Sequence, residues 1–214
     1  RQATLTAWVG EVDAEPRVSV GFVWVGEQTG ADDLVGALRS LGRPVDEQVR
    51  ELSYLELQQM DDDVEGHSYR RYWKGHFCRE LPDAAIEAFI LRGTPDGRGD
   101  GLPYAGLQAY GGAIADVPDE ATAFSHRDTF VEFVSASKWT DPAEDEMRMA
   151  AARRYGATLA PYASGAYVNA LTDEGFAGVK RAYSPEKLVR LTALKNTWDP
   201  DNVFHLNHNI APGG

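Results

Sequence analysis

Two strand-like runs open the chain with almost nothing between them. Residues 3–12 and 17–25 are rich in Val, Leu, Trp, Phe and Thr, and the residues from Asp13 to Pro16 have turn-forming character. Strand-like runs joined by a short polar turn predict an antiparallel hairpin. A fold that begins in this way is not built only from βαβ units, because parallel strands need long crossover connections.

The rest of the chain mixes helical and strand-like patterns without a βαβ rhythm. Asp141-Pro142-Ala143-Glu144 is typical of a helix start with a capping box, and Gly111-Gly112 interrupts a strand. We therefore expect an α+β fold, in which an antiparallel sheet is covered on one face by helices and followed by a helical C-terminal segment. The predicted helices are 31–41, 54–60, 83–91, 141–155 and 184–198, and the predicted further strands are 45–52, 69–81, 107–114 and 129–139.

Composition narrows the class of protein. The chain has 214 residues and a formal net charge of −12, which disfavours nucleic acid or an anionic membrane as the main partner. No apolar run approaches the roughly 18 residues that a membrane-spanning helix needs. Cys78 is the only cysteine, so an internal disulfide and a cysteine-based zinc site are excluded. The compartment stays open between the bacterial cytoplasm and secretion.

The common catalytic and nucleotide-binding motifs are missing. The sequence holds no GxGxxG, Walker, HExxH or GxSxG pattern, and its five histidines are scattered. We therefore expect no metal site and no hydrolase chemistry. A dinucleotide- or phosphate-cradling loop of the usual kind is also not expected.

Glu132 is the carboxylate that stands out. It lies in the apolar run Phe130-Val131-Glu132-Phe133-Val134, where burying a charge is costly unless it is paired. Two interpretations stay open: it points harmlessly to an edge, or it faces a closed pocket. In the second case burial would raise its pKa and suit it to general base catalysis. Tyr167 and Asn169 alternate as strand residues do, and would face the same way.

Several blocks, in order, resemble the berberine-bridge-enzyme-like FAD-linked oxidoreductases, and the resemblance covers nearly the whole chain. Tyr167-Val168-Asn169 matches three places of that family's Tyr-x-Asn-Tyr or Tyr-x-Asn-His motif. Glu132 follows the central block at a distance similar to a glutamate that acts as the base in members forming the berberine bridge. The other matching blocks are Tyr72-Trp73-Lys74 with Phe77, Tyr110-Gly111-Gly112-Ala113, Thr122-Ala123-Phe124, His126-Arg127, Trp198 to Phe204, and Asn207 to Pro212.

The resemblance implies an FAD-dependent oxidoreductase. Such an enzyme oxidises an alcohol, an amine or an activated C–H group by hydride transfer to the flavin, with O2 as acceptor. It implies Glu132 and Tyr167 as catalytic residues. It also implies that Asn169, Asn207 and Asn209 bind the cofactor, and that Trp73 and Tyr110 line the substrate site.

Two departures from the family pattern qualify these expectations. Ala170 stands where many members carry a catalytic tyrosine, so a tyrosine-base mechanism does not transfer. No FAD-binding domain is visible, and Cys78 is in the wrong place to link a flavin. We expect a partial substrate domain over 1–160 and a segment over 161–214 that returns to an absent N-terminal FAD-binding domain. The chain alone is expected neither to retain FAD nor to turn over.

A second function stays open beside the oxidase. Ala170 equally suits a non-enzymatic domain that binds a small molecule, or a scaffold domain, that uses the oxidase sheet without redox chemistry.

Overall fold

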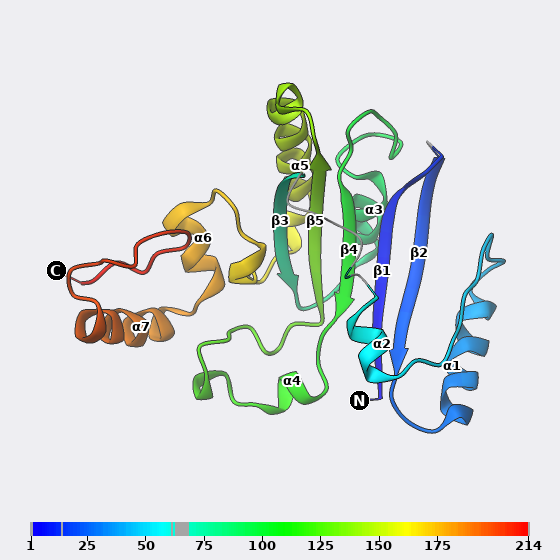
Figure 1. The fold of residues 1–214 in the computed structure, drawn as a ribbon, viewed down its shortest axis with the longest axis horizontal. Coiled ribbons are helices and arrows are strands. Elements are labelled where there is room, and N and C mark those ends of the chain that lie inside the picture. The colour runs from blue at the N-terminus through cyan, green and yellow to red at the C-terminus, as the bar shows by residue number, and fades with distance from the viewer. Residues whose placement is uncertain (1, 14, 61, 63–68, 214) are drawn as a thin grey trace.

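The structure is a computed structural model that describes residues 2–13, 15–60, 62 and 69–213. Its centre is a five-stranded antiparallel sheet with the strand order β2-β1-β4-β5-β3 (Figure 1). The predicted hairpin is confirmed as its first two strands. The strands are β1 Ala3–Val12, β2 Glu15–Trp24, β3 Arg70–Cys78, β4 Tyr104–Ala109 and β5 Val131–Trp139.

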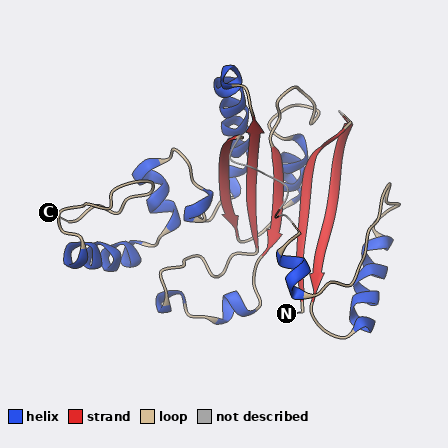
Figure 2. Cartoon of the chain, in the orientation of Figure 1, coloured by secondary structure: helices blue, strands red, loops and turns tan. Residues whose placement is uncertain are grey.

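Helices cover one face of this sheet (Figure 2). Phe133 of β5 packs edge-to-face against Phe89 of α3 and Tyr155 of α5, and all three side chains are buried. The predicted α+β fold with a helix layer on one face is therefore confirmed. The helices are α1 Gln28–Ser40, α2 Tyr54–Gln58, α3 Asp83–Leu91, α4 Ala113–Asp116, α5 Asp145–Leu159, α6 Gly175–Ala182 and α7 Pro185–Trp198.

The C-terminal segment lies beyond the β3 edge of the sheet, at the side opposite β2 (Figure 1). The Ser184 hydroxyl accepts a hydrogen bond from the Lys187 backbone N–H at the start of α7, where Pro185 is the first helical residue. The helix ends at Trp198. Asp199 then accepts hydrogen bonds from the backbone N–H groups of Val203 and Phe204. The predicted boundaries of this helix are confirmed, because capping and proline chemistry are strong local signals.

Three local predictions are wrong. Residues 45–52 form no strand, and the strand predicted over 107–114 is β4, which starts earlier and ends at Ala109. Gly111 and Gly112 follow with φ of 113° and 54°, a backbone that cannot continue a strand, and α4 comes next. Glu144 does not close a capping box but pairs with Arg148 one turn along. None of the described helices is both long and apolar enough to cross a membrane.

Candidate functional site

The face of the sheet away from α3 and α5 carries the predicted site residues Glu132 and Trp73. Side chains alternate along a strand, so Phe133 on the helix side places Glu132 on the other side. The register sets Glu132 directly between Gln108 of β4 and Phe77 of β3. We call this surface the open face, meaning the side chains that share the side of Glu132.

A tyrosine–glutamate pair lies at one end of the open face. The Tyr110 hydroxyl donates a hydrogen bond of 2.7 Å to the Glu132 carboxylate, which is only 6% exposed. Burial raises the pKa of Glu132, and the hydrogen bond from Tyr110 opposes part of that rise. Burial, together with the neighbouring Glu132, raises the pKa of Tyr110. Tyr110 therefore stays a hydrogen-bond donor, and Glu132 is the group of the pair that can accept a proton.

An aromatic cluster around Phe77 connects this pair with Tyr167. The ring of Phe77 lies edge-on to Tyr110 at 5.3 Å and stacks on Tyr167 at 6.4 Å. Phe124 closes the group against both tyrosines. A cavity of ≈ 190 Å³ lies beside the cluster, lined among others by Phe77, Phe124, Tyr167 and Asn169. The structure thus brings Tyr110, Glu132 and Tyr167 to one cluster of rings.

The alternation of Tyr167 and Asn169 predicted a strand, but neither residue lies in one. Tyr167 precedes the 3-10 helix Val168–Ala170. They do face the same way, because the Asn169 side-chain amide donates a hydrogen bond of 2.8 Å to the Tyr167 hydroxyl. The hydrogen bond between the two side chains, and not strand alternation, therefore holds them on one side.

Ala170 has no space for a larger side chain. It is buried, and its methyl group lies where a Cβ on Gly75 would have to be. Gly75 and Ala170 are therefore a matched pair of small residues that lets the turn seat on β3. A tyrosine at position 170 would need both this turn and the strand below it to shift.

The segment 164–182 forms hydrogen bonds with the backbone of β3 along the outer edge of that strand. Phe77 donates to the carbonyl of Gly165 at 2.9 Å, and its own carbonyl accepts from Ser164 at 2.7 Å. Further along the strand, the Thr172 hydroxyl donates to the Trp73 carbonyl at 2.9 Å, and Arg181 donates to the Gly75 carbonyl at 3.2 Å. These contacts fix the position of Tyr167 relative to the sheet.

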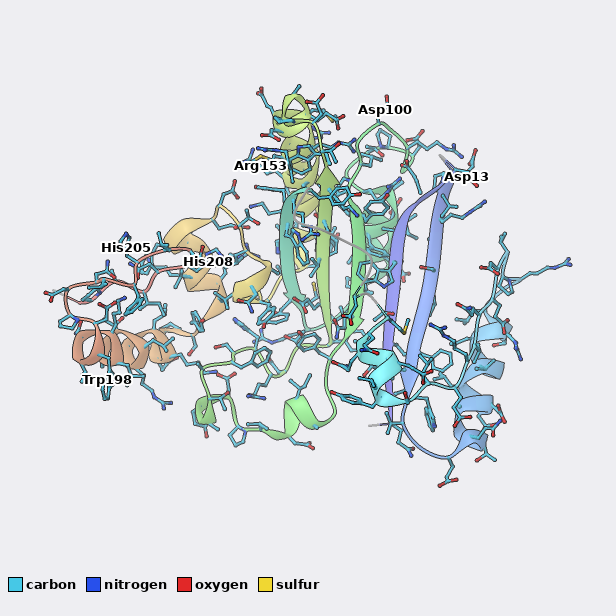
Figure 3. The ribbon with its side chains drawn as sticks, viewed as in Figure 1. Asp13, Asp100, Arg153, Trp198, His205 and His208 are labelled. Carbon is cyan, nitrogen blue, oxygen red and sulfur yellow. The ribbon has the colours of Figure 1, made fainter. Side chains whose placement is uncertain are left out.

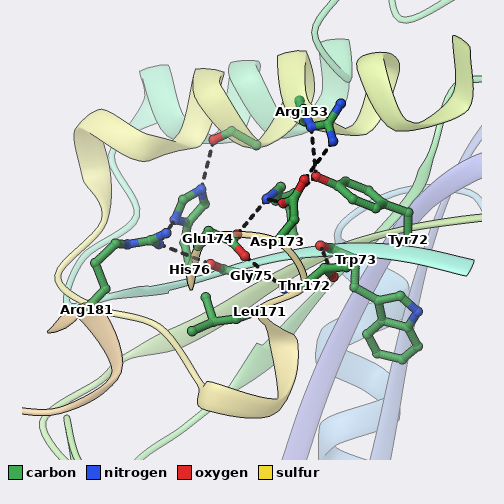
Figure 4. A network of polar contacts seen from close by, with 12 residues as sticks. Tyr72, Trp73, Gly75, His76, Arg153, Leu171, Thr172, Asp173, Glu174 and Arg181 are labelled. Atoms are coloured by element: carbon green, nitrogen blue, oxygen red, sulfur yellow. Dashed lines mark hydrogen bonds and ion pairs between the residues drawn. The ribbon is translucent and has the colours of Figure 1, made fainter. Parts of the chain in front are cut away.

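A charged network, which we call the clamp, locks the same segment from the helix side (Figure 4). Asp173 accepts hydrogen bonds from Tyr72 at 2.7 Å, Lys74 at 2.6 Å and Arg153 of α5 at 2.6 Å. Lys74 also reaches Glu174 at 2.7 Å. Burial alone would raise the pKa of Asp173, but these three donors hold it well below its ordinary value. The clamp joins β3, α5 and the C-terminal segment through one carboxylate.

His76 extends the clamp with a defined tautomer. Its Nε2 lies 2.8 Å from the Gly156 carbonyl, which can only accept, so that nitrogen carries the proton. Its Nδ1 lies 2.6 Å from Arg181, which can only donate, so that nitrogen is unprotonated. Burial and the nearby Arg181 charge lower the pKa of His76 to about 4. His76 is therefore neutral in the folded protein.

The neutral His76 predicts a specific dependence of stability on pH. The unfolded chain takes up a proton near pH 6.5 and the folded chain near 4, so stability is full above 6.5 and falls as the pH drops through this window. We expect a loss of about 1.4 kcal/mol for each pH unit in the unfolding free energy, measured by urea titration. A His76→Gln variant lacks this contribution, whereas His205→Gln, at an exposed position (Figure 3), retains it. Equal slopes in His76→Gln and the unchanged protein would contradict the assignment.

The sequence reasoning missed the clamp residues Lys74, Asp173 and Arg181. A signal was present, because Tyr72, Lys74 and His76 alternate through one strand and so share one face. Polar groups at three successive inward positions of a strand require partners, and the acidic pair Asp173-Glu174 can supply them. The pairing was not predicted because Lys74 and Asp173 are 99 residues apart in the sequence.

The three asparagines predicted to bind the cofactor lie in two segments. His208, between Asn207 and Asn209, contacts the Leu171 carbonyl at 3.1 Å, which ties the C-terminal loop to the turn that holds Asn169. Asn209 lines a hollow of ≈ 380 Å³ with Trp198, Phe204 and Leu206 at its rim. Trp198, labelled in Figure 3, is 81% exposed, and Phe204 is 82% exposed.

These residues fit one part of a flavin and not another. Side-chain amides both donate and accept hydrogen bonds, which suits the alternating donors and acceptors on the edge of the isoalloxazine ring. A diphosphate instead needs backbone N–H groups at the start of a substantial helix. The glycine pair Gly111-Gly112 leads only into the four-residue α4. The described residues therefore fit the ring edge and offer no cradle for the diphosphate.

Comparison with known proteins identifies relatives of this chain. Residues 166–211 match the family model described as "Berberine and berberine like". The uncharacterized FAD-linked oxidoreductases YvdP and YgaK of Bacillus subtilis (strain 168) are 24% and 26% identical to this chain, over 89% and 98% of it. The chain covers 43% and 46% of their lengths, which is less than half of each relative.

The fold also occurs among solved structures. The crystal structure of aclacinomycin oxidoreductase superposes on 99% of this chain with a TM-score of 0.81 and 18% sequence identity. This chain covers 47% of that protein. The sheet, its helix layer and the C-terminal segment are therefore an architecture that recurs within a larger protein.

Proposed function

We propose, from the similarity of this chain to the C-terminal half of berberine-bridge-enzyme-like FAD-linked oxidoreductases, that it supplies the substrate-binding wall of a flavin-dependent oxidase. The observation that carries the proposal is the buried pair of Tyr110 and Glu132 on the open face. A carboxylate with a raised pKa, beside a hydroxyl that stays protonated, is a pair of groups with separate acid and base roles.

On this proposal the residues of the chain have different roles. Glu132 takes the proton from an O–H or N–H group of the substrate as the hydride leaves a neighbouring C–H bond, and Tyr110 holds the carboxylate in place. Tyr167, with its hydroxyl positioned by Asn169, orients the substrate from the opposite side of Phe77. Trp73 lines the same open face further along β3. Bound FAD would supply the two-electron acceptor for this oxidation, with O2 as the final acceptor.

The cofactor-binding role is assigned to the C-terminal segment. Asn169, Asn207 and Asn209 would hold the ring edge of the flavin. The exposed Trp198 and Phe204 would contact the part of the longer relatives that this chain does not cover, which would be the nucleotide-binding half. The domain boundary near residue 160 belongs to the same proposal, since the segment after it both seats on β3 and carries these residues.

The function is tested by flavin reduction in the protein that joins a nucleotide-binding half to this chain. We expect the flavin absorbance band to bleach when the protein is mixed anaerobically with one of a panel of alcohols and amines. Hydrogen peroxide should form when O2 is admitted. The 214-residue chain alone serves as control and should lose all flavin absorbance on dialysis. Retained flavin in that control would contradict the division of the site between two halves.

One observation favours a second function. Ala170 is buried against Gly75 and leaves no position there for the catalytic tyrosine of many relatives. A domain that binds a small molecule without oxidising it would have this feature. It predicts that ligands perturb the flavin spectrum without bleaching it, which distinguishes the two functions in the same experiment.

A further inference from the structure

Two aromatic rings on the open face lie flat over glycines of the neighbouring strand. A Cβ placed on Gly106 of β4 would meet the six-membered ring of Trp8 at 2.7 to 2.9 Å. A Cβ placed on Gly10 of β1 would meet the ring of Tyr104 at 2.6 and 3.1 Å. The arrangement is reciprocal, because each strand gives one ring and one glycine. Only the absence of a side chain on each glycine lets the rings lie down on the backbone.

The rings remain open to ligands on their other side. Trp8 is 49% exposed and Tyr104 is 53% exposed. Trp73 continues the surface across β5, since Tyr104, Ala136 and Trp73 are paired residues in one row; it is 42% exposed and points away from α5 (Figure 4). We call the surface formed by Trp8, Tyr104 and Trp73 the aromatic floor.

The floor has the size and polarity for a particular kind of ligand. From Trp8 to Trp73 it crosses three strand spacings, about 14 Å, which accommodates several fused rings. The positions between the three rings are Gly10, Gly106, Val134 and Ala136, and none of them carries a charge. The residues between the rings offer no side-chain hydrogen-bond partner for the hydroxyls of a sugar, whereas a neutral planar ring system needs only flat apolar contact.

The floor is continuous with the site that holds Glu132. The row that contains Trp8, Gly106 and Val134 is followed, two residues along each strand, by the row that contains Gln108 and Glu132. That separation is about 7 Å. A planar ligand on the floor therefore extends to the carboxylate at one end without covering it.

We propose that the aromatic floor binds the neutral, planar, fused-ring part of the substrate and so determines the substrate class. The inference rests on the proposed function for the identity of the ligand as a substrate, although the binding itself does not require turnover. Trp8 and Tyr104 act as specificity-determining residues, and Gly106 and Gly10 keep their rings parallel to the sheet.

The test is calorimetric titration of the 214-residue chain with 2-(hydroxymethyl)anthraquinone, a neutral three-ring probe, and with xylobiose, a sugar. We expect the planar probe to bind with one-to-one stoichiometry and xylobiose not to bind. Trp8→Ala and Tyr104→Ala should each raise the Kd about tenfold, the effect of removing one stacking ring. Trp198→Ala, which removes a tryptophan on α7 that is more exposed than Trp8, should leave the Kd unchanged.

A second variant tests the proposal independently if Trp8→Ala fails to fold. Gly106→Ala retains the indole but inserts a carbon where the ring lies, so it should weaken the probe by a similar factor while circular dichroism stays unchanged. The proposal is overturned if the probe does not bind, if these variants leave its Kd unchanged, or if xylobiose binds in a Trp8-dependent manner. Because the titration involves no flavin, its failure is distinguishable from a failure of the oxidase chemistry.

Discussion

Replacing Glu132 with Gln is expected to slow flavin reduction by roughly 100- to 10,000-fold, the usual contribution of a positioned general base. Glutamine keeps the size of the side chain and an acceptor for the Tyr110 hydroxyl, but it cannot take a proton at this site. The measurement is the anaerobic rate of bleaching by stopped-flow absorbance in the flavin-containing protein. Flavin content should be unchanged, since the carboxylate is not among the residues assigned to the cofactor.

The matched control is Glu87→Gln, which makes the same change at an exposed position on α3. An unchanged rate in Glu132→Gln would remove Glu132 from the mechanism and assign the proton to another acceptor.

The same carboxylate determines the expected pH dependence. The deprotonated form is the active base, and the pKa of Glu132 is raised above its ordinary value of 4.5. The rate should therefore be full at high pH and fall as the pH drops through that raised pKa. Because the Tyr110 hydrogen bond lowers the pKa, Tyr110→Phe should move the acid limb to higher pH. A limb that moves to lower pH would contradict the pairing.

Replacing Lys74 with Met is expected to destabilise the fold by roughly 2–3 kcal/mol. The Lys74 side chain is 13% exposed and pairs with both Asp173 and Glu174, so its loss leaves two adjacent carboxylates with one cation fewer. The value lies below that of a fully buried pair, because Asp173 is 37% exposed and retains Arg153. Urea unfolding followed by circular dichroism measures the effect.

Lys180→Met on α6 is the control for this change. It removes the same side chain from an exposed position, where Lys180 only lies over the ring of Phe176, and should cost well under 1 kcal/mol. Equal stabilities of the two variants would mean that the clamp contributes nothing beyond an ordinary surface charge.

Local chemistry made much of the fold predictable. The β1–β2 hairpin, α3 and α7 were predicted well because each is bounded by turn, cap or proline signals that act over a few residues. The predicted strand 45–52 failed because apolar residues alone do not make a strand without a neighbour to pair with. Val45 and Val49 are exposed.

The candidate site was predictable only in part. Glu132 stood out as a charge in an apolar run, but its contact with Tyr110 depends on the register of β4 against β5, which sets Gln108 opposite Glu132 and Tyr110 two residues further along. The flat rings of Trp8 and Tyr104 were not predicted, since each depends on a glycine in another strand. Pairings between distant segments of this kind need the register of the sheet, which the sequence pattern alone does not determine.

The hydrogen bonds between residues 164–182 and the β3 edge also affect the tendency of the protein to aggregate. A sheet edge with free N–H and C=O groups is a template on which a second chain can add a strand. Here the N–H and carbonyl of Phe77 and the carbonyls of Trp73 and Gly75 are already bonded within the molecule. The C-terminal segment therefore protects the β3 edge of the sheet from pairing with a second chain. A chain truncated before Ser164 would lose this protection together with Tyr167.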